Sequence, residues 1–546
     1  MKQSKSFTTD VLVIGTGLTG LRAANEAARE GANVILVGKG VNASVDIMGF
    51  NIAIRPGDSE DIYYEDIIRS GNYINNKKAA RLLAEESTKQ VAYLESIGFV
   101  FDKNDDGTYH AQHPIGSTIP RLIHQKAVSG IEAIKLITAD NEKRGVRVQY
   151  PVMITELLKN EDNVIGAVGM DLKDGTFVSY LCKSVILATG GCGKIHPIST
   201  YPKGIVGDGY AMGHRAGAEL IDMEFLQYEP CCLVYPEEVI GQPLPTTMVM
   251  AGAELYNSKG ETFTQNYGLH RGNMQKGELS RAIAAEIEAG RGTKNGGIYY
   301  DLTMLPHDYI AVDHCIFYEP ALAAGLDITK VKAEVAPAAH TCLGGIKINE
   351  RCESTVNGLY AAGEVAGGVH GANRIGGSAG AETLSFGAVA GRFAARNALK
   401  SQNNVSADIT ATYIDNHKQD HFAKYNRSGT LTSDNLYEKL SMLMHKKVGI
   451  IRDNEGLLSA ASQLKKIKSE LHNVAVNDLN NLIMLYQLEN MITTSKMQIK
   501  SSLIRKESRG VYFRSDYPEK NDQEWLKNIT IKQEEGEMTA YIKDCE

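Results

Sequence analysis

Three glycines near the N-terminus have the spacing of a phosphate-binding turn. Gly15, Gly17 and Gly20 give the pattern GxGxxG between an apolar run, residues 10–14, and an alanine-rich segment, residues 21–30. A strand, a glycine turn and a helix in this order let a pyrophosphate approach the backbone at the N-terminus of the helix. The segment therefore predicts a dinucleotide-binding site.

Further apolar segments must supply the rest of the sheet that carries this turn. Residues 33–37 follow the first helix, and residues 184–191 and 357–364 repeat the order of apolar strand and then glycine. Strands separated by long crossovers are typical of a parallel α/β sheet. Gly38 and Lys39 stand where the second strand usually ends in a ribose-binding acid. We expect the dinucleotide to be bound without that acid.

Composition excludes several classes of protein. The 546 residues carry a net charge of −7, which argues against a nucleic-acid binder. No stretch approaches the ~20 apolar residues that span a bilayer, so we expect no direct membrane insertion. The eight cysteines contain no CxxC pair, so we expect this chain to hold no metal or iron–sulfur cluster. The N-terminus lacks a signal-peptide pattern, and the expected location is the cytoplasm.

Several longer motifs together resemble one family. They comprise the Gly207-Asp208-Gly209 turn and residues 216–227, 370–377, 505–510 and 514–518. In this order they resemble the flavoprotein subunit of fumarate reductase and succinate dehydrogenase. The resemblance runs from residue 10 to about residue 525, which is nearly the whole chain.

The resemblance implies an α/β fold with a two-part Rossmann-like FAD-binding domain, an inserted α+β capping domain and a C-terminal helical domain. Apolar positions at helical spacing in residues 456–473 and 478–500 agree with the helical domain. The expected boundaries are 1–232 and 341–397 for the two parts of the FAD-binding domain, 233–340 for the capping domain, 398–515 for the helical domain and 516–546 for a C-terminal tail.

The family's FAD contacts carry over to this chain one position at a time. Glu364 matches the glutamate that holds the ribitol or ribose, and Lys39 matches a lysine after the second strand. The helix that starts near Ser378 and Ala379 would aim its N-terminal amides at the flavin N1–O2 edge. The other implied contacts are Gly15, Gly17, Gly20, Gly190, Gly191 and Asp208. Residues 40–55 lack the histidine that attaches FAD covalently in several members, so noncovalent FAD is expected.

Two substrate-binding residues of the family are present. His340 and Arg374 match residues that contact a substrate carboxylate in the family. Arginine suits that role because its planar guanidinium binds a carboxylate through two parallel hydrogen bonds. Both residues could instead be structural, as a core histidine and an ion pair within the fold.

The remaining substrate signatures are replaced. Glu229 stands where the family has the histidine of its His-Pro-Thr-Gly motif, and Lys276 stands in place of the catalytic arginine. A glutamate would repel the second carboxylate of fumarate unless it were protonated, which argues against fumarate or succinate. Glu229 could bind a substrate amine or hydroxyl, carry a proton with a raised pKa, or be purely structural. Lys276 could be the proton donor or a solvent-exposed loop residue.

The sequence therefore predicts an FAD-dependent oxidoreductase acting on a small anionic substrate, with reduction of a C=C bond or its reverse as the leading chemistry. Alternatives are an adenylylsulfate-reductase-like subunit, an aspartate-oxidase-like amine oxidation and an electron-transfer subunit without its own substrate. An iron–sulfur or other electron-transfer partner is possible, since no second dinucleotide turn is evident. Adjacent Cys231 and Cys232 are either two small buried residues or a redox-active thiol pair.

Overall fold

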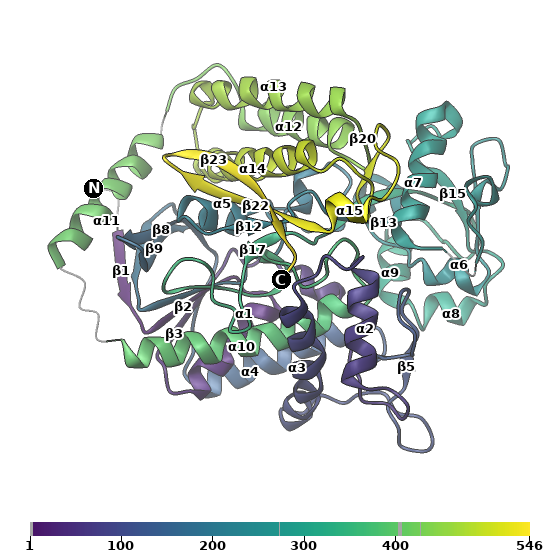
Figure 1. Ribbon diagram of the computed structural model, residues 1–546, viewed down its shortest axis with the longest axis horizontal. Coiled ribbons are helices and arrows are strands. Elements are labelled where there is room, and N and C mark those ends of the chain that lie inside the picture. The colour runs from purple at the N-terminus through teal and green to yellow at the C-terminus, as the bar shows by residue number, and fades with distance from the viewer. Residues whose placement is uncertain (1–3, 272–273, 402–406, 426) are drawn as a thin grey trace.

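A parallel five-stranded sheet forms the centre of the larger domain in this computed structural model, which describes residues 4–271, 274–401, 407–425 and 427–546 (Figure 1). The strands lie in the order β18-β11-β2-β3-β7. Their bounds are β2 (Val11–Ile14), β3 (Val34–Val37), β7 (Arg147–Gln149), β11 (Ser184–Leu187) and β18 (Leu359–Ala361). Every residue of β2 and β3 is buried, which explains their unbroken apolar sequence.

Two helices of this domain pack with their backbones almost in contact. Helix α1 (Leu18–Arg29) follows the glycine turn, and α10 (Ser378–Lys400) lies directly against it. A Cβ on Gly391 of α10 would lie 2.3 Å from the carbonyl oxygen of Ala23 in α1. The small residues of α10 therefore allow a close crossing that fixes α1, and with it the glycine turn.

Smaller sheets and helices surround the parallel sheet. One antiparallel-rich sheet has the order β1-β10-β9-β8, and a short one has the order β4-β6-β5. Their bounds are β1 (Ser4–Thr8), β4 (Phe50–Asn51), β5 (Ala111–Gln112), β6 (Leu122–Ile123), β8 (Val152–Asn160), β9 (Asn163–Asp171) and β10 (Phe177–Leu181). The accompanying helices are α2 (Glu60–Ser70), α3 (Lys77–Ser96), α4 (Ser129–Lys143) and α5 (Asp208–Arg215).

A second, smaller domain has its own apolar core, and Figure 1 shows it to one side of the molecule. Its antiparallel sheet has the order β13-β16-β15-β14. The strands are β13 (Leu226–Tyr235), β14 (Glu254–Tyr256), β15 (Ile298–Asp301) and β16 (Ala333–Cys342), and the helices are α6 (Thr247–Ala251), α7 (Lys276–Glu286), α8 (His307–Ala311) and α9 (Cys315–Ala323). The capping domain was expected to span residues 233–340. Strand β13 begins before residue 233 and β16 ends after residue 340, so both strands cross these expected boundaries.

Long helices form the third region. The segments predicted to be helical correspond to α13 (Asn454–Glu470) and α14 (Leu479–Ile504), which pack against each other. The other two are α11 (Ala407–Lys424) and α12 (Ser433–Lys447). The predicted α/β fold with an inserted α+β domain and a helical region is confirmed.

The prediction of a C-terminal tail over residues 516–546 is wrong. This segment contains α15 (Asp522–Trp525) and a hairpin of β22 (Lys527–Glu534) and β23 (Glu537–Asp544). The hairpin extends the sheet β19-β17-β12-β22-β23, whose other strands are β12 (Leu220–Ile221), β17 (Gly345–Lys347) and β19 (Ala366–Gly367). Charged residues on the exposed positions hide the strand pattern, because one face of this edge is solvated.

Candidate active site

The glycine turn forms one wall of a cavity at the carboxyl ends of β2, β3 and β11. Gly15 has a φ of +123°, and a Cβ on this residue would lie 2.0 Å from the carbonyl oxygen of Ala188. A Cβ on Gly20 would lie 1.8 Å from the carbonyl oxygen of Gly15. Only glycine fits either position, so the turn brings bare backbone and the start of α1 to the cavity. This arrangement fits a dinucleotide pyrophosphate.

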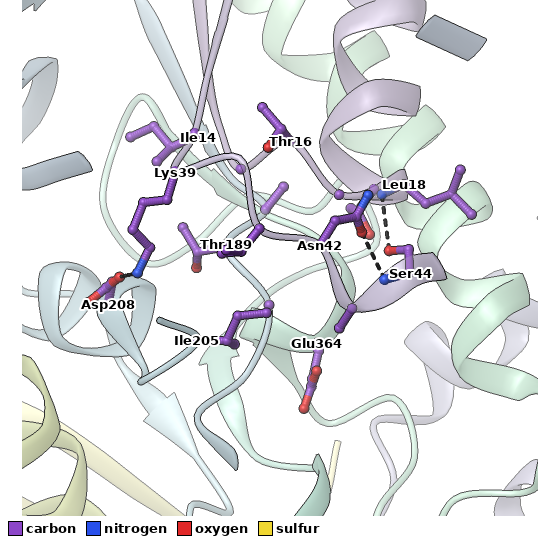
Figure 2. A pocket seen from close by; sticks show the side chains of 18 of the residues that line it. Ile14, Thr16, Leu18, Lys39, Asn42, Ser44, Thr189, Ile205, Asp208 and Glu364 are labelled. Atoms are coloured by element: carbon purple, nitrogen blue, oxygen red, sulfur yellow. Dashed lines mark hydrogen bonds and ion pairs between the residues drawn. The ribbon is translucent and has the colours of Figure 1, made fainter. Parts of the chain in front are cut away.

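Lys39 and Asp208 line the same cavity, and the Lys39 side chain extends from beside Ile14 to Asp208 (Figure 2). The Lys39 Nζ atom donates to Asp208 Oδ2 at 2.5 Å and also to the carbonyl oxygen of Gly204. Asp208 Oδ1 accepts a second hydrogen bond, of 2.8 Å, from Asn490 Nδ2. Both predicted cofactor residues therefore line the cavity, and they form an ion pair with each other.

Two wall residues had no signal in the sequence. Ser44 Oγ accepts a hydrogen bond of 3.1 Å from the backbone N–H of Leu18, at the first turn of α1. Asn42 Oδ1 accepts one of 2.8 Å from the Ser44 N–H, as the dashed lines of Figure 2 show. The loop after β3 therefore covers part of the helix N-terminus. Short polar residues in a loop are too common for a sequence pattern to single these two out.

Glu364 lies at the junction of this cavity with a second one. Its Oε1 atom accepts a 2.8 Å hydrogen bond from the Cys342 backbone N–H and another from the Tyr201 hydroxyl. Burial raises the pKa of Glu364 to about 7, although these hydrogen bonds act in the opposite direction. The carboxyl group is thus partly protonated near neutral pH.

The remaining predicted cofactor glycines have different surroundings. Gly190 lines the first cavity with a φ of +71°, whereas Gly191 is packed against Glu364. A Cβ on Gly191 would lie 2.2 Å from the Glu364 Oε1 atom. Gly191 therefore makes room for Glu364 instead of facing the cavity itself.

The N-terminus of α10 reaches the second cavity through its backbone. Ala379 lines this cavity, while Ser378 is fully buried beside it. The Ser378 Oγ atom accepts hydrogen bonds of 3.0 Å from the Tyr63 hydroxyl and from Asn51 Nδ2. With the serine hydroxyl engaged inside the protein, contact with a ligand at this helix end would come from backbone amides.

The four predicted substrate and catalytic residues meet in the second cavity, of about 290 Å³. Glu229 comes from β13, Lys276 from the start of α7, His340 from β16 and Arg374 from the loop before α10. Helix α7 packs on both β13 and β16, which brings residues distant in sequence together. The larger domain supplies Arg374 and the smaller domain the other three, so the cavity lies between them.

Glu229, which is buried, and Lys276, which is partly buried, form an ion pair. Lys276 Nζ donates to Glu229 Oε2, and Thr246 Oγ1 donates to Glu229 Oε1 at 3.0 Å. Burial alone would raise the pKa of Glu229, but the charge of Lys276 and the hydrogen bonds from Lys276 and Thr246 hold it below its usual value. The hypothesis of a glutamate with a raised pKa is therefore wrong. Thr246 was not singled out in the sequence.

His340 is neutral near pH 7. Burial, followed by the positive charge of Lys276, lowers the pKa of His340 to about 3. Its Nδ1 atom lies 3.1 Å from Thr200 Oγ1, and its Nε2 atom lies 3.8 Å from Glu229 Oε2. A neutral imidazole has one N–H donor and one acceptor, so His340 can donate one hydrogen bond to a ligand or a neighbour.

Arg374 is 6% exposed and carries an unused donor. Its Nη1 atom donates to the carbonyl oxygen of Ile375 at 3.1 Å. Its buried Nε atom has no hydrogen-bond partner among the residues that the structure describes. Arg374 also lines the second cavity, and a guanidinium there fits an anionic ligand.

Cys231 and Cys232 are buried in the smaller domain. Cys231 belongs to its apolar core, and the Cys232 Sγ atom donates to the carbonyl oxygen of Glu229 at 3.7 Å. These surroundings favour the interpretation of the two cysteines as small buried residues.

Comparison with known proteins identifies the family of this chain. The FAD binding domain family profile matches residues 10–379, and the fumarate reductase flavoprotein C-terminal profile matches residues 437–545. The chain belongs to the fumarate reductase and succinate dehydrogenase flavoprotein family. FAD is accordingly its cofactor, and the chain is a flavoprotein oxidoreductase.

Relatives within this family extend over the whole chain. One subunit of the fumarate reductase (CoM/CoB) of Methanothermobacter marburgensis is 35% identical over 541 residues, which cover 97% of this chain and 98% of that protein. An uncharacterized FAD-dependent oxidoreductase of Methanocaldococcus jannaschii is 36% identical and covers 96% of both chains. A quinol-fumarate reductase structure with menaquinol has a TM-score of 0.92 at 25% identity, covering 99% of both chains. Within the described residues, no helix is long and apolar enough to cross a membrane.

Proposed function

We propose that this flavoprotein reduces an activated C=C bond of a small carboxylate, or catalyses the reverse reaction, with Lys276 as the proton carrier. The observation that carries the proposal is the arrangement of Lys276, His340 and Arg374 around one cavity that meets the FAD cavity at Glu364. When bound, FAD supplies the hydride or accepts it. The residues of the chain bind the substrate and move the proton.

Arg374 and His340 would hold the substrate carboxylate. The free Arg374 N–H offers a charged donor, and the neutral His340 offers an uncharged one. A hydrogen bond to a charged group contributes about 1.5–3 kcal/mol to binding. Because the two residues come from different domains, bound substrate would also hold the domains together and exclude water.

Lys276 would donate a proton from its Nζ atom to the substrate carbon next to the one that receives the hydride. Glu229 would orient this ammonium, since its carboxylate is paired with it and is itself positioned by Thr246. An ammonium releases its proton more readily than a guanidinium, so lysine can replace the family's catalytic arginine.

Fumarate itself is the second candidate substrate, because Glu229 is paired. The sequence-based argument against fumarate depended on repulsion by an unpaired glutamate, and Lys276 neutralises that charge. Lys276, Arg374 and Glu229 together leave one positive charge, which matches a monocarboxylate best. Pairing also counts against an amine substrate, since Glu229 would have to leave Lys276 to meet an ammonium group.

Reoxidation of the dithionite-reduced holoenzyme, followed without oxygen, tests this proposal. The panel is fumarate, crotonate, acrylate, adenylylsulfate and, with the oxidised enzyme, aspartate. We expect an unsaturated carboxylate to reoxidise the flavin of the wild-type protein but not that of Lys276→Met. The control variant Lys259→Met changes an exposed lysine of the smaller domain and should react like wild type. If no carboxylate reacts or perturbs the flavin spectrum, the proposal is wrong and an electron-transfer subunit without its own substrate is favoured.

A further inference from the structure

Two cysteines that the proposed reaction does not use lie in contact inside the protein. Cys192 follows β11 and the Gly190-Gly191 pair, and Cys342 is the last residue of β16. Their Sγ atoms are 2.8 Å apart, although 150 positions separate them in the chain. Cys192 is completely buried and Cys342 is 4% exposed. A long-range contact thus places two buried thiols side by side.

This cysteine pair adjoins the region that binds the cofactor. Cys342 lines the second cavity, and its backbone N–H donates to Glu364, which lines both cavities. On the other side, Gln498 Nε2 donates to the Cys192 Sγ atom at 3.4 Å. The pair is therefore held in place between the helical region and the wall of the active-site cavity.

We propose that Cys192 and Cys342 form a dithiol/disulfide centre that exchanges two electrons with FAD. In the oxidising direction both S–H bonds break and one Sγ–Sγ bond forms. The two electrons and two protons released are taken up by oxidised FAD. The reverse direction consumes two electrons and two protons from the reduced cofactor and restores both thiols. The centre would let the protein hold four reducing electrons instead of two.

The geometry suits this bond. A disulfide has its sulfur atoms about 2.05 Å apart, so the two sulfurs must approach each other by less than about 1 Å. The hydrogen bond to Cys342, followed by burial, raises the pKa of Cys192 well above its usual value. Burial shields the pair from dissolved thiols and oxidants, whereas the cofactor region adjoins it.

Peptide mapping tests whether the bond forms. The holoenzyme is fully reduced with dithionite or fully oxidised with ferricyanide, unfolded in guanidinium with N-ethylmaleimide and digested with trypsin. We expect peptides 184–194 and 333–347 to be joined in the oxidised sample and separately alkylated in the reduced one. The peptide containing Cys352, another buried cysteine, should be alkylated in both. Separate alkylation of both peptides after oxidation would overturn the proposal.

An electron count tests exchange with the cofactor. In anaerobic dithionite titration of the oxidised holoenzyme, followed by flavin absorbance and by thiol content, we expect four electrons per chain for wild type and Cys352→Ser. Cys192→Ser and Cys342→Ser should each take two, a twofold decrease. A wild-type value of two electrons, or a joined peptide that persists after the flavin is fully reduced, would overturn the exchange. Neither assay contains a carboxylate, so their outcome is independent of the proposed substrate reaction.

Discussion

At the scale of single residues, the ion pair between Glu229 and Lys276 is central to the proposed chemistry. Lys276 donates its proton as an ammonium ion, and the Glu229 carboxylate pairs with that ammonium. Because Glu229 is buried and Lys276 is largely covered, removing either side chain leaves the other charge without its partner. Function and local stability therefore depend on the same contact.

The variant Lys276→Met is expected to lower kcat by about 10²–10⁴-fold, the usual contribution of a general acid. Glu229→Gln is expected to lower kcat as well, because it removes the carboxylate that holds the Lys276 Nζ atom in place. Turnover of both variants, compared with wild type, measures these effects. A kcat of Glu229→Gln equal to that of wild type would exclude this role for the glutamate.

Glu364 should make the cofactor-free protein less stable as the pH rises from about 4.5 to about 7. Its folded-state pKa of about 7 lies above the ordinary value of 4.5, so within this window the folded state binds more protons than the unfolded state. Stability from the protonated form is complete below the window and is lost as the pH rises through it. The variant Glu364→Gln should reduce the difference in thermal midpoint between pH 4.5 and pH 8. An equally large difference in the variant would contradict the prediction.

At the scale of elements, glycines in the turn between β2 and α1 serve two different purposes: Gly20 allows close packing of the backbone, and Gly17 leaves room for the cofactor. A Cβ on Gly20 would clash with the Gly15 carbonyl oxygen, whereas a Cβ on Gly17 would make ordinary contacts with Ser44 Oγ at 3.4 Å and Asn42 Oδ1 at 3.5 Å. We expect Gly20→Ala to lower the thermal midpoint of the apoprotein and its FAD occupancy. Gly17→Ala should leave the apoprotein midpoint unchanged and weaken FAD binding. Equal apoprotein midpoints in the two variants would show that the close contact at Gly20 is unimportant.

The hairpin of β22 and β23 offers a matched pair of isoleucines. Ile531 is completely buried where β22 pairs with β12, and Ile542 on β23 is 48% exposed. Truncating a buried isoleucine to alanine destabilises a protein by about 2–5 kcal/mol, whereas exposed positions change stability by about 0.5 kcal/mol or less. Thermal unfolding of Ile531→Ala and Ile542→Ala should show this contrast. Similar midpoints would mean that the hairpin contributes little to the fold.

At the scale of the whole molecule, FAD is expected to act as a removable ligand that stabilises the fold. A ligand that binds only the folded state raises stability as its concentration increases, so added FAD should raise the apoprotein's thermal midpoint. Because residues 40–55 contain no histidine, acid precipitation of the holoenzyme should leave all flavin absorbance in the supernatant. Yellow, flavin-containing precipitate would show a covalent bond.

Local patterns allowed much of the fold to be predicted, and they failed where contacts are long-range. The Gly15–Gly20 turn could be predicted from its glycine spacing. The two long helices, α13 and α14, could be predicted from apolar residues at helical spacing. Glu229 and Lys276 were identified as separate replacements, but their pairing depends on how α7 packs on β13. Tyr201 and Thr246 carry no motif at all. The hairpin was missed because its partner, β12, is only two residues long.

The pairing of β12 with β22 also has a consequence for synthesis. Leu220 pairs with Ile531, so β12 is synthesised about 300 residues before the strand with which it pairs. Such non-local contacts form slowly during folding. Until the hairpin emerges from the ribosome, Asp222 lacks the hydrogen bond from Asn528 Nδ2, and one edge of β12 stays unpaired. A stalled or shortened nascent chain would leave that edge of β12 exposed.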